Sequence, residues 1–241
     1  MGINPPRTYS GYCFYRGSVA MNNLSAENVK QYKSNRDFWS VHDHGAILTY
    51  RIGIDEIMWG IYRNHTEAEM RDVLLDSKGH QHRVSLTKDM RPEILADLRV
   101  WSRRHFPPQL SNCTDQSVTT TVQAMSDCHS SQNSFLNGKV LLIGEASTLL
   151  RPHIVAGTDH AVYHAHRLKD LVEGRIDIDE WCQNTKAYSN VLEQCGKEQG
   201  DIWMKMDGDL EVVLESRRSR AKMVNCAEAI ERSLRVILTK V

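Results

Sequence analysis

The sequence predicts an α+β protein: a mixed or antiparallel sheet with helices, followed by the C-terminal strand and helices of an α/β domain. Three observations support this fold class. Aromatic and β-branched segments of strand length alternate with turn residues in the first half of the chain. Segments with apolar residues three and four positions apart dominate the second half. Near residue 140 an apolar run ends in a glycine and a carboxylate, and a helical pattern follows.

The expected elements of the first half follow from local signals. Aromatic-rich runs predict strands, and spaced apolar positions after a capping residue or proline predict helices. The expected strands are Tyr9–Ala20, Phe38–Arg51, Ile57–Tyr62 and Thr121–Met125, and the expected helices are Ser25–Tyr32, Glu67–Asp76 and Pro92–His105. Pro107 and Pro108 end the third helix, and the polar residues 112–121 predict a loop.

A motif between residues 138 and 158 is the most informative part of the second half. A turn at Asn137-Gly138 precedes a predicted buried strand at Val140–Ile143, which ends in Gly144-Glu145. A loop containing a proline then leads to a helix that begins near Thr158. This order is typical of α/β proteins that hold a polar cofactor at the carboxyl ends of their strands.

The residue types in this motif suit a polar, partly anionic ligand. A carboxylate such as Glu145 accepts strong hydrogen bonds from sugar or ribityl hydroxyls. Gly144 and Gly157 allow a ligand to approach the backbone, because they have no Cβ. Free N–H groups near Thr158 favour negative charge. The alternative is an ordinary buried strand and helix joined by a loop, and the spacing alone does not separate the two.

The helix that begins near Thr158 is expected to bury one apolar face. The residues that would form this face are Ala161, Ala165, Leu168 and Val172. His160 and His164 have a spacing that zinc sites use, but neither a His-Glu-x-x-His motif nor a third ligand is found. We therefore expect solvent-facing histidines beside the apolar face. Gly174 should end the helix, and a second helix is predicted at Asp179–Glu193.

Composition narrows the function classes. The 241 residues allow one or two domains with a substantial core. The 30 basic and 30 acidic side chains cancel, so no global field favours nucleic acid or an anionic membrane. No apolar run has the length of a membrane span, and residues 1–12 lack the apolar core of a signal peptide. We expect a cytoplasmic protein without nucleic-acid or membrane partners.

Cysteines and histidines predict neither disulfides nor a metal site. The chain has no Cys-x-x-Cys pair, and a chain of this length without a secretion signal does not need disulfides. We expect reduced thiols at Cys13, Cys113, Cys128, Cys182, Cys195 and Cys226. His80 and His82 would share one side of a strand, but no third ligand stands at a suitable spacing.

Several motifs in the expected order resemble one enzyme family. The run from Gly138 to Leu168 resembles the second flavin-binding motif of the FAD-dependent aromatic hydroxylases, the class A flavoprotein monooxygenases. Its Arg151-Pro152-His153 and Ala156-Gly157-Thr158 elements are similar to the 2,6-dihydroxypyridine 3-monooxygenase branch. Further matching segments are Tyr12–Gly17, His44-Gly45, Leu48–Tyr50, Trp59–Asn64 and Thr121–Asp127. The resemblance covers roughly residues 9–205.

The resemblance implies a function and a division into domains. Residues 9–130 would form a substrate-binding-like sheet domain and residues 135–205 the C-terminal part of an FAD-binding domain, while residues 206–241 have the pattern of a helical tail. The cofactor would be FAD, the co-substrate NADH or NADPH, and the substrate a small aromatic or heteroaromatic ring. FAD would lie near Gly144, Glu145, Pro152, Ala156, Gly157 and Thr158, and the substrate near Tyr62, Gln123 and His153. No catalytic residue is assigned.

The sequence departs from the family pattern at two points that bear on FAD binding. The family has Gly-Asp where this chain has Gly144-Glu145, whose side chain is one methylene longer. The family also opens with a Gly-x-Gly-x-x-Gly loop, whereas no two of the 14 glycines here are two positions apart. We therefore expect a truncated monooxygenase. The alternative is a non-catalytic relative or binding module without a complete flavin site. An exposed strand at residues 140–143 would favour aggregation or a homodimer.

Overall fold

The computed structural model describes residues 5–32, 37–42, 45–117 and 119–205. Its main sheet has seven strands in the order β2-β3-β4-β1-β6-β5, with β9 paired to β6. All of these pairings are antiparallel, which confirms the α+β prediction. The strands are β1 Thr8–Ala20, β2 Phe38–His42, β3 Gly45–Ile52, β4 Glu56–Asn64, β5 Ser85–Leu86, β6 Thr120–His129 and β9 Thr148–Leu149.

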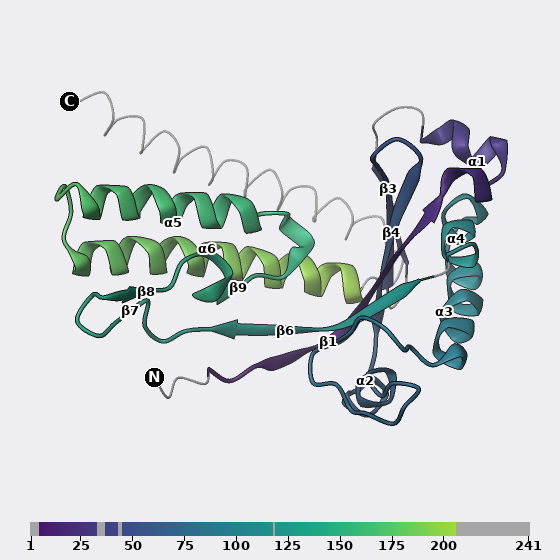
Figure 1. Ribbon diagram of the computed structural model, residues 1–241, viewed down its shortest axis with the longest axis horizontal. Helices are drawn as coiled ribbons and strands as arrows, with labels where there is room; N and C mark the ends of the chain where they lie inside the picture. Colours follow the sequence, from purple (N-terminus) through teal and green to yellow (C-terminus); the bar gives the residue numbers. More distant parts are fainter. Residues whose placement is uncertain (1–4, 33–36, 43–44, 118, 206–241) are drawn as a thin grey trace.

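Helices lie on both sides of this sheet (Figure 1). The helices α3 and α4 cover one face, at Pro92–His105 and Pro108–Asp115. The helices α5 and α6, at Gly157–Val172 and Ile178–Lys205, form an antiparallel pair on the other side, and the end of α6 reaches β3 and β4. The shorter elements are α1 Ala26–Gln31, α2 Glu67–Val73 and the 3-10 turns η1 Met21–Asn23, η2 Gly144–Ala146 and η3 Pro152–Ile154.

Residues along β1 alternate between two cores, as the period of a strand requires. Cys13 and Tyr15 pack in the larger core beneath α3 and α4. Tyr12 and Phe14 point to the opposite face, where they pack with Tyr62, Met125, Trp203 and Met204. We call this second face, carrying Tyr12, Phe14 and Tyr62, the aromatic face. It lies on the side of the sheet that α6 reaches.

Local sequence signals predict most of these elements well, but the single strand predicted at Phe38–Arg51 is wrong, because this segment contains β2 and β3, which pair antiparallel with each other. Ser25 caps α1 by accepting a hydrogen bond from the Asn28 N–H at 3.2 Å, and α3 begins at Pro92 and ends at His105 as expected. The predicted loop at residues 112–121 is partly wrong, because its first residues belong to α4. Pro108 ends no helix: it occupies the first turn of a new one, where its missing N–H costs nothing.

The predicted buried strand at Val140–Ile143 is wrong in length and burial. Only Val140–Leu141 forms a strand, β8, which pairs with β7 at Ser134–Phe135 across the expected turn. Both residues of β8 are half-buried, and Ile143 is 39% exposed. The prediction assumed that this strand belongs to a parallel sheet, in which helices cover both faces and bury a short apolar strand completely. The described residues provide only a two-stranded hairpin here.

The predicted buried face of α5 is also wrong. Val172 is 79% exposed and Ala165 is exposed, whereas His160 and His164 are fully buried against α6. Apolar spacing shows which face a helix could bury, but the packing partner decides which face it does bury. The end of α5 matches the prediction, since Gly174 follows the C-cap with a positive φ of 71°. The helix α6 extends twelve residues beyond the predicted Glu193.

Some sequence predictions fall partly or wholly outside the described residues. The helical tail at residues 206–241 and Cys226 lie there. Cys13, Cys113, Cys128 and Cys182 are free thiols. Of the helices within the described ranges, none combines the length and apolarity that a membrane crossing requires.

Candidate flavin site at the start of helix α5

Gly144 and Glu145, from the predicted cofactor set, lie against the first turns of α5. Gly144 has a φ of +54°, a conformation that favours glycine, and a Cβ there would lie 3.2 Å from the Ala161 Cβ. The turn η2 therefore packs directly on the helix. Oε1 of Glu145 lies 3.5 Å from the position that a Cβ would occupy at Gly157. The structure thus brings the Gly-Glu pair and the helix start together.

The start of α5 has no side-chain cap among the described residues. Ala156 occupies the N-cap position and has no side-chain acceptor to offer. The N–H groups of the first turn lack intrahelical partners, and the helix dipole adds partial positive charge there. Thr158 is exposed in this turn, and Pro152 is exposed at the start of η3. This arrangement can accept an anionic or carbonyl group.

His153 lies in the loop before α5 and packs on the aromatic face. Its side chain is buried, and its Nε2 is 2.9 Å from the Tyr12 hydroxyl oxygen. Its ring centroid is 4.6 Å from that of Tyr62 and 4.9 Å from that of Trp203. Burial, together with the charge of Arg151, lowers the pKa of His153 to about 3. Burial raises the pKa of Tyr12, so both groups are neutral at pH 7.

The three residues expected on the substrate side share the aromatic face. Tyr62 contacts His153 directly. In the strand register Gln123 pairs with Phe14, and Phe14 pairs with Tyr62. Directly paired residues point to the same side of a sheet, so Gln123 lies on this face, about 10 Å from Tyr62 at the usual strand spacing. Gln123 is half-buried, and no hydrogen bond of its side chain is recorded within the described residues.

Arg151 has a structural role that the sequence did not predict. The sequence motifs include this residue only as the first member of the Arg-Pro-His element. Its guanidinium donates two hydrogen bonds to Asp127 on β6, at 2.8 and 2.7 Å, and one to Asp201 on α6 at 2.9 Å. The partners are 24 and 50 residues away along the chain, which is why sequence spacing does not reveal them. Arg151 thereby attaches the His153 loop to both the sheet and α6.

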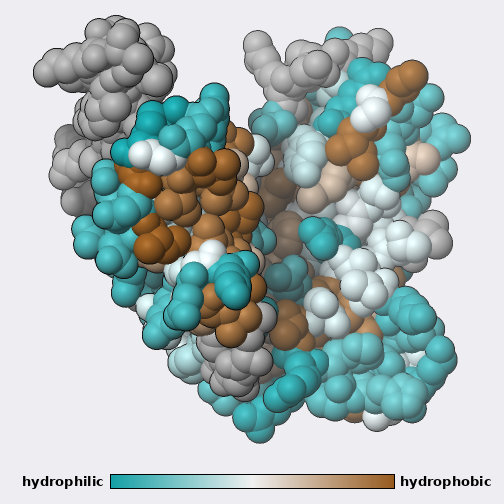
Figure 2. Space-filling model, turned by 60° about the vertical axis from the view of Figure 1, so that its left-hand side comes forward, coloured by the Kyte–Doolittle hydropathy of each residue, from teal (hydrophilic) through white to brown (hydrophobic). Residues whose placement is uncertain are grey.

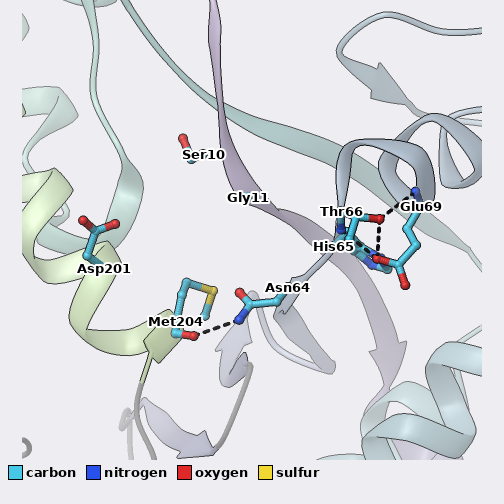
Figure 3. A pocket seen from close by; sticks show the side chains of 8 residues that line it. All are labelled: Ser10, Gly11, Asn64, His65, Thr66, Glu69, Asp201 and Met204. Carbon is cyan, nitrogen blue, oxygen red and sulfur yellow. Dashed lines mark hydrogen bonds between the residues drawn. The ribbon is translucent and has the colours of Figure 1, made fainter.

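A separate pocket of about 390 Å³ lies where β1 bulges, at the end of β4 (Figure 3). It contains none of the residues predicted for cofactor or substrate. Asn64 closes one side by donating a hydrogen bond to the Met204 carbonyl at 2.8 Å, and Thr66 and Glu69 bond to each other in a capping box. The lining residues are Ser10, Gly11, Asn64, His65, Thr66, Glu69, Asp201 and Met204.

The described residues contain no group of three or more His, Cys, Asp or Glu side chains arranged for a metal ion. His80 and His82 do meet a carboxylate, because both lie near Oδ2 of Asp76, at 3.4 and 3.0 Å. Asp76 also accepts the backbone N–H groups of Lys78 and His80. These contacts explain the two histidines as partners of a turn-forming aspartate.

The comparisons with known proteins agree with these motifs. A family model described as FAD binding domain-like matches residues 9–127. The 2,6-dihydroxypyridine 3-monooxygenase of Paenarthrobacter nicotinovorans is 26% identical over 215 residues, which cover 80% of this chain and 51% of the relative. The chain resembles the FAD-dependent aromatic hydroxylases. The resemblance seen in the sequence motifs is thereby confirmed.

Three solved structures, two of them of hydroxylases, share the fold. The 2,6-dihydroxypyridine-3-hydroxylase from Arthrobacter nicotinovorans has a TM-score of 0.76 at 19% identity, covering 87% of this chain and 56% of that one. A salicylate hydroxylase substrate complex has a TM-score of 0.64 at 13% identity, and the match covers 95% of this chain and 55% of that one. Klebsiella pneumoniae HpxO with FAD and uric acid has a TM-score of 0.59 at 18% identity, and the match covers 91% of this chain and 51% of that one. The chain spans about half the length of these proteins.

Proposed function

We propose that this chain contributes the substrate-facing sheet and the second flavin-binding motif of an FAD-dependent monooxygenase acting on small aromatic or heteroaromatic rings. One observation carries the proposal. His153 packs on the aromatic face, and α5 begins beside Glu145 only a few residues later. Gly157 follows His153 by four residues, which span at most about 14 Å, so the aromatic face and the helix start adjoin one another. A planar cofactor and a planar substrate could share this junction.

The residues at the helix start fit FAD. Glu145 can accept hydrogen bonds from ribityl hydroxyls, and Gly157 beside it has no side chain to keep a ligand from the backbone. Gly144 contributes by packing the turn against Ala161 of α5. The uncapped N–H groups at Gly157 and Thr158 suit its electron-rich atoms, with Pro152 and Ala156 bordering the loop. When bound, FAD would supply the redox and oxygen chemistry, with NADH or NADPH as the reductant.

Side chains of the aromatic face would bind and orient the substrate. Phe14 and Tyr62 stack with ring centroids 4.3 Å apart and form an apolar surface that excludes water. Nδ1 of His153 is buried and has no partner within the described residues, so it can exchange a hydrogen bond with a ligand. Gln123 offers both a donor and an acceptor to polar ring substituents. Each of these side chains is neutral, which suits an uncharged ring.

Self-association is a further part of the proposal. Apolar side chains gather on the surface formed by α5, α6 and the β7–β8 hairpin, which lies on the left of Figure 2. Large exposed apolar side chains on these elements are Leu136, Val162, Val172 and Val191, and Ile143 is exposed just after β8. Apolar patches of this kind mark contact surfaces. We propose that two copies associate there as a homodimer.

Titration of the purified 241-residue chain with FAD tests the proposed function. We expect saturable quenching of flavin fluorescence, and a dissociation constant at least about tenfold higher for Glu145→Ala, since charge-assisted hydrogen bonds contribute about 1.5–3 kcal/mol. Glu173→Ala is the matched control, because this exposed carboxylate stands at the opposite end of α5. Absence of saturable binding would favour the alternative, a non-catalytic binding module.

A further inference from the structure

His164, on the buried face of α5, contacts the motif turn from inside the protein. Its Nδ1 lies 3.1 Å from the backbone nitrogen of Gly144, which donates its N–H to it. The carbonyl of Gly144 accepts from the Ser147 hydroxyl at 2.8 Å and from the Ser147 N–H at 2.9 Å. Both backbone polar groups of Gly144 are therefore satisfied, and the N–H depends on a single side chain.

The hydrogen bonds around His164 define its tautomer. Because Nδ1 accepts, the neutral ring carries its proton on Nε2, which lies 3.2 Å from both the Thr185 carbonyl and the Ser189 hydroxyl. Ser189 donates to the Thr185 carbonyl at 2.8 Å. His164 thus links the motif turn to α6 through one rigid ring, and the ring is fully buried.

This contact matters because the motif strand itself is weakly held. In the described structure β8 has two residues and one partner strand. Gly144 lies beyond the last pair, so no sheet hydrogen bond holds it. Its approach to α5 is fixed by packing on Ala161 and by the bond to His164, one turn further along the same helix.

We propose that His164 is a positioning residue of the flavin site, holding the Gly144 N–H so that the Glu145 carboxylate stays beside the first turn of α5. This inference rests on the proposed function for the identity of the ligand. His164 touches neither cofactor nor substrate. It acts through the backbone of Gly144, whose left-handed conformation directs the next residue toward Gly157.

Three variants separate this role from general packing. His164→Leu removes the acceptor and fills the space of the ring with an apolar side chain. His164→Asn places an amide oxygen at the position of Nδ1 and restores the acceptor. His160→Leu is the matched control, because His160 is equally buried on the same helix but bonds to Ser189 and not to Gly144.

Amide hydrogen exchange at Gly144 reports the bond without any cofactor. Selective ¹⁵N-glycine labelling limits the spectrum to the 14 glycines, and Ile–Gly pairs occur only at 52–53 and 143–144, so carbonyl-labelled isoleucine narrows the choice to two signals. Gly53 is exposed and Gly144 is buried, so the more slowly exchanging signal of the wild type belongs to Gly144. We expect exchange at Gly144 to be at least tenfold faster in His164→Leu than in His160→Leu. The FAD dissociation constant should rise at least tenfold in His164→Leu alone, and His164→Asn should recover both properties.

The outcomes distinguish the two proposals. Equal Gly144 exchange in His164→Leu and His160→Leu would overturn the positioning role. Faster exchange with unchanged FAD affinity would also overturn it, because the turn would then be released without effect on the ligand. If the wild-type chain binds no FAD, the proposed function fails and the flavin role of His164 fails with it, while the exchange data still decide whether the bond exists.

Discussion

At the scale of single residues, Arg151 has the largest structural role in the candidate site. Its side chain is 8% exposed, and Asp127 beside it is 15% exposed, so this ion pair is largely withdrawn from water. A buried charge is tolerated when its hydrogen bonds are satisfied, and Arg151 meets this condition with two carboxylates. Its guanidinium also lies 5.9 Å from the centre of the Tyr12 ring. The residue joins the sheet, the motif loop and α6 at one point.

Replacing Arg151 by methionine should destabilise the fold by about 3 kcal/mol, because it leaves the Asp127 carboxylate buried without a partner. The free energy of unfolding in urea measures this effect. Arg103→Met is the control, since Arg103 pairs with Asp115 while 52% exposed. Exposed pairs contribute at most about 1 kcal/mol. Equal losses in the two variants would show that the Arg151 network adds nothing beyond a surface pair.

At the scale of elements, the last turns of α6 determine how closely the motif loop approaches the sheet. Gly196 and Gly200 stand one turn apart on α6, and both face the loop at residues 151–153. A Cβ at Gly200 would lie 2.8 Å from Cδ2 of His153 and 3.0 Å from the Tyr12 hydroxyl. Glycine usually weakens a helix. Here its missing side chain provides the space that His153 occupies.

Alanine at Gly200 should therefore destabilise the protein by about 1–3 kcal/mol through overpacking, although alanine normally strengthens a helix. Thermal or urea unfolding measures the change. Gly196→Ala is the matched control in the same helix, where the nearest atom is the Arg151 carbonyl oxygen at 3.3 Å, so a smaller cost is expected. Stabilisation by Gly200→Ala would mean that His153 does not pack against α6.

At the scale of the whole molecule, buried histidines make stability depend on pH. Four histidines are buried within the described residues, in the larger core, on the aromatic face and between α5 and α6: His65, His153, His160 and His164. Burial lowers the pKa of His65 and of His160 to about 4 each, with the charge of Arg63 and the neighbouring His164 adding to these shifts. Burial also lowers the pKa of His164. Each of these three buried regions therefore contains at least one histidine that is neutral in the folded protein.

Stability should fall steadily as the pH drops from 6.5 to 4.5. Below pH 6.5 these histidines become protonated in the unfolded chain but stay neutral in the folded protein, because their pKa values there are lower. The free energy of unfolding therefore decreases as the pH falls from 6.5 toward the folded pKa values. Each histidine contributes at most about 1.4 kcal/mol per pH unit in this range. Urea midpoints between pH 7.5 and 4.5 test this.

The double variant His65→Gln, His160→Gln provides the control for this pH dependence. It removes two of the titrating groups while keeping polar side chains at both positions, so its profile should be flatter than that of the wild type. A wild-type profile that is flat across the whole range would show that the buried histidines do not couple to folding.

Much of the fold could be predicted from local signals. Ser25, Pro92 and Gly174 act on the residues next to them, and the helix boundaries they predict agree with the structure. The structure brings the motif residues Gly144, Glu145 and Gly157 together, although Gly144 lies in the 3-10 turn η2 and not at the end of a strand. Their role as ligand contacts remains a prediction.

Contacts between distant segments could not be predicted. Apolar spacing on α5 suggested that Val172 is buried and that His164 faces solvent, and both expectations were wrong. A polar residue can be buried when a partner is supplied from elsewhere, and the partners of His164 are Gly144, Thr185 and Ser189. No periodicity in α5 itself contains that information.

By itself, the sequence determined the fold class, the family resemblance and the order of the motif around Gly144, because caps, turns and strand patterns depend on residues close together in the chain. The tertiary structure alone decided which face of α5 is buried, that Arg151 joins Asp127 to Asp201, and that His153 meets Tyr12 and Tyr62. These features depend on packing between elements, where the burial of one polar group is set by a partner many residues away.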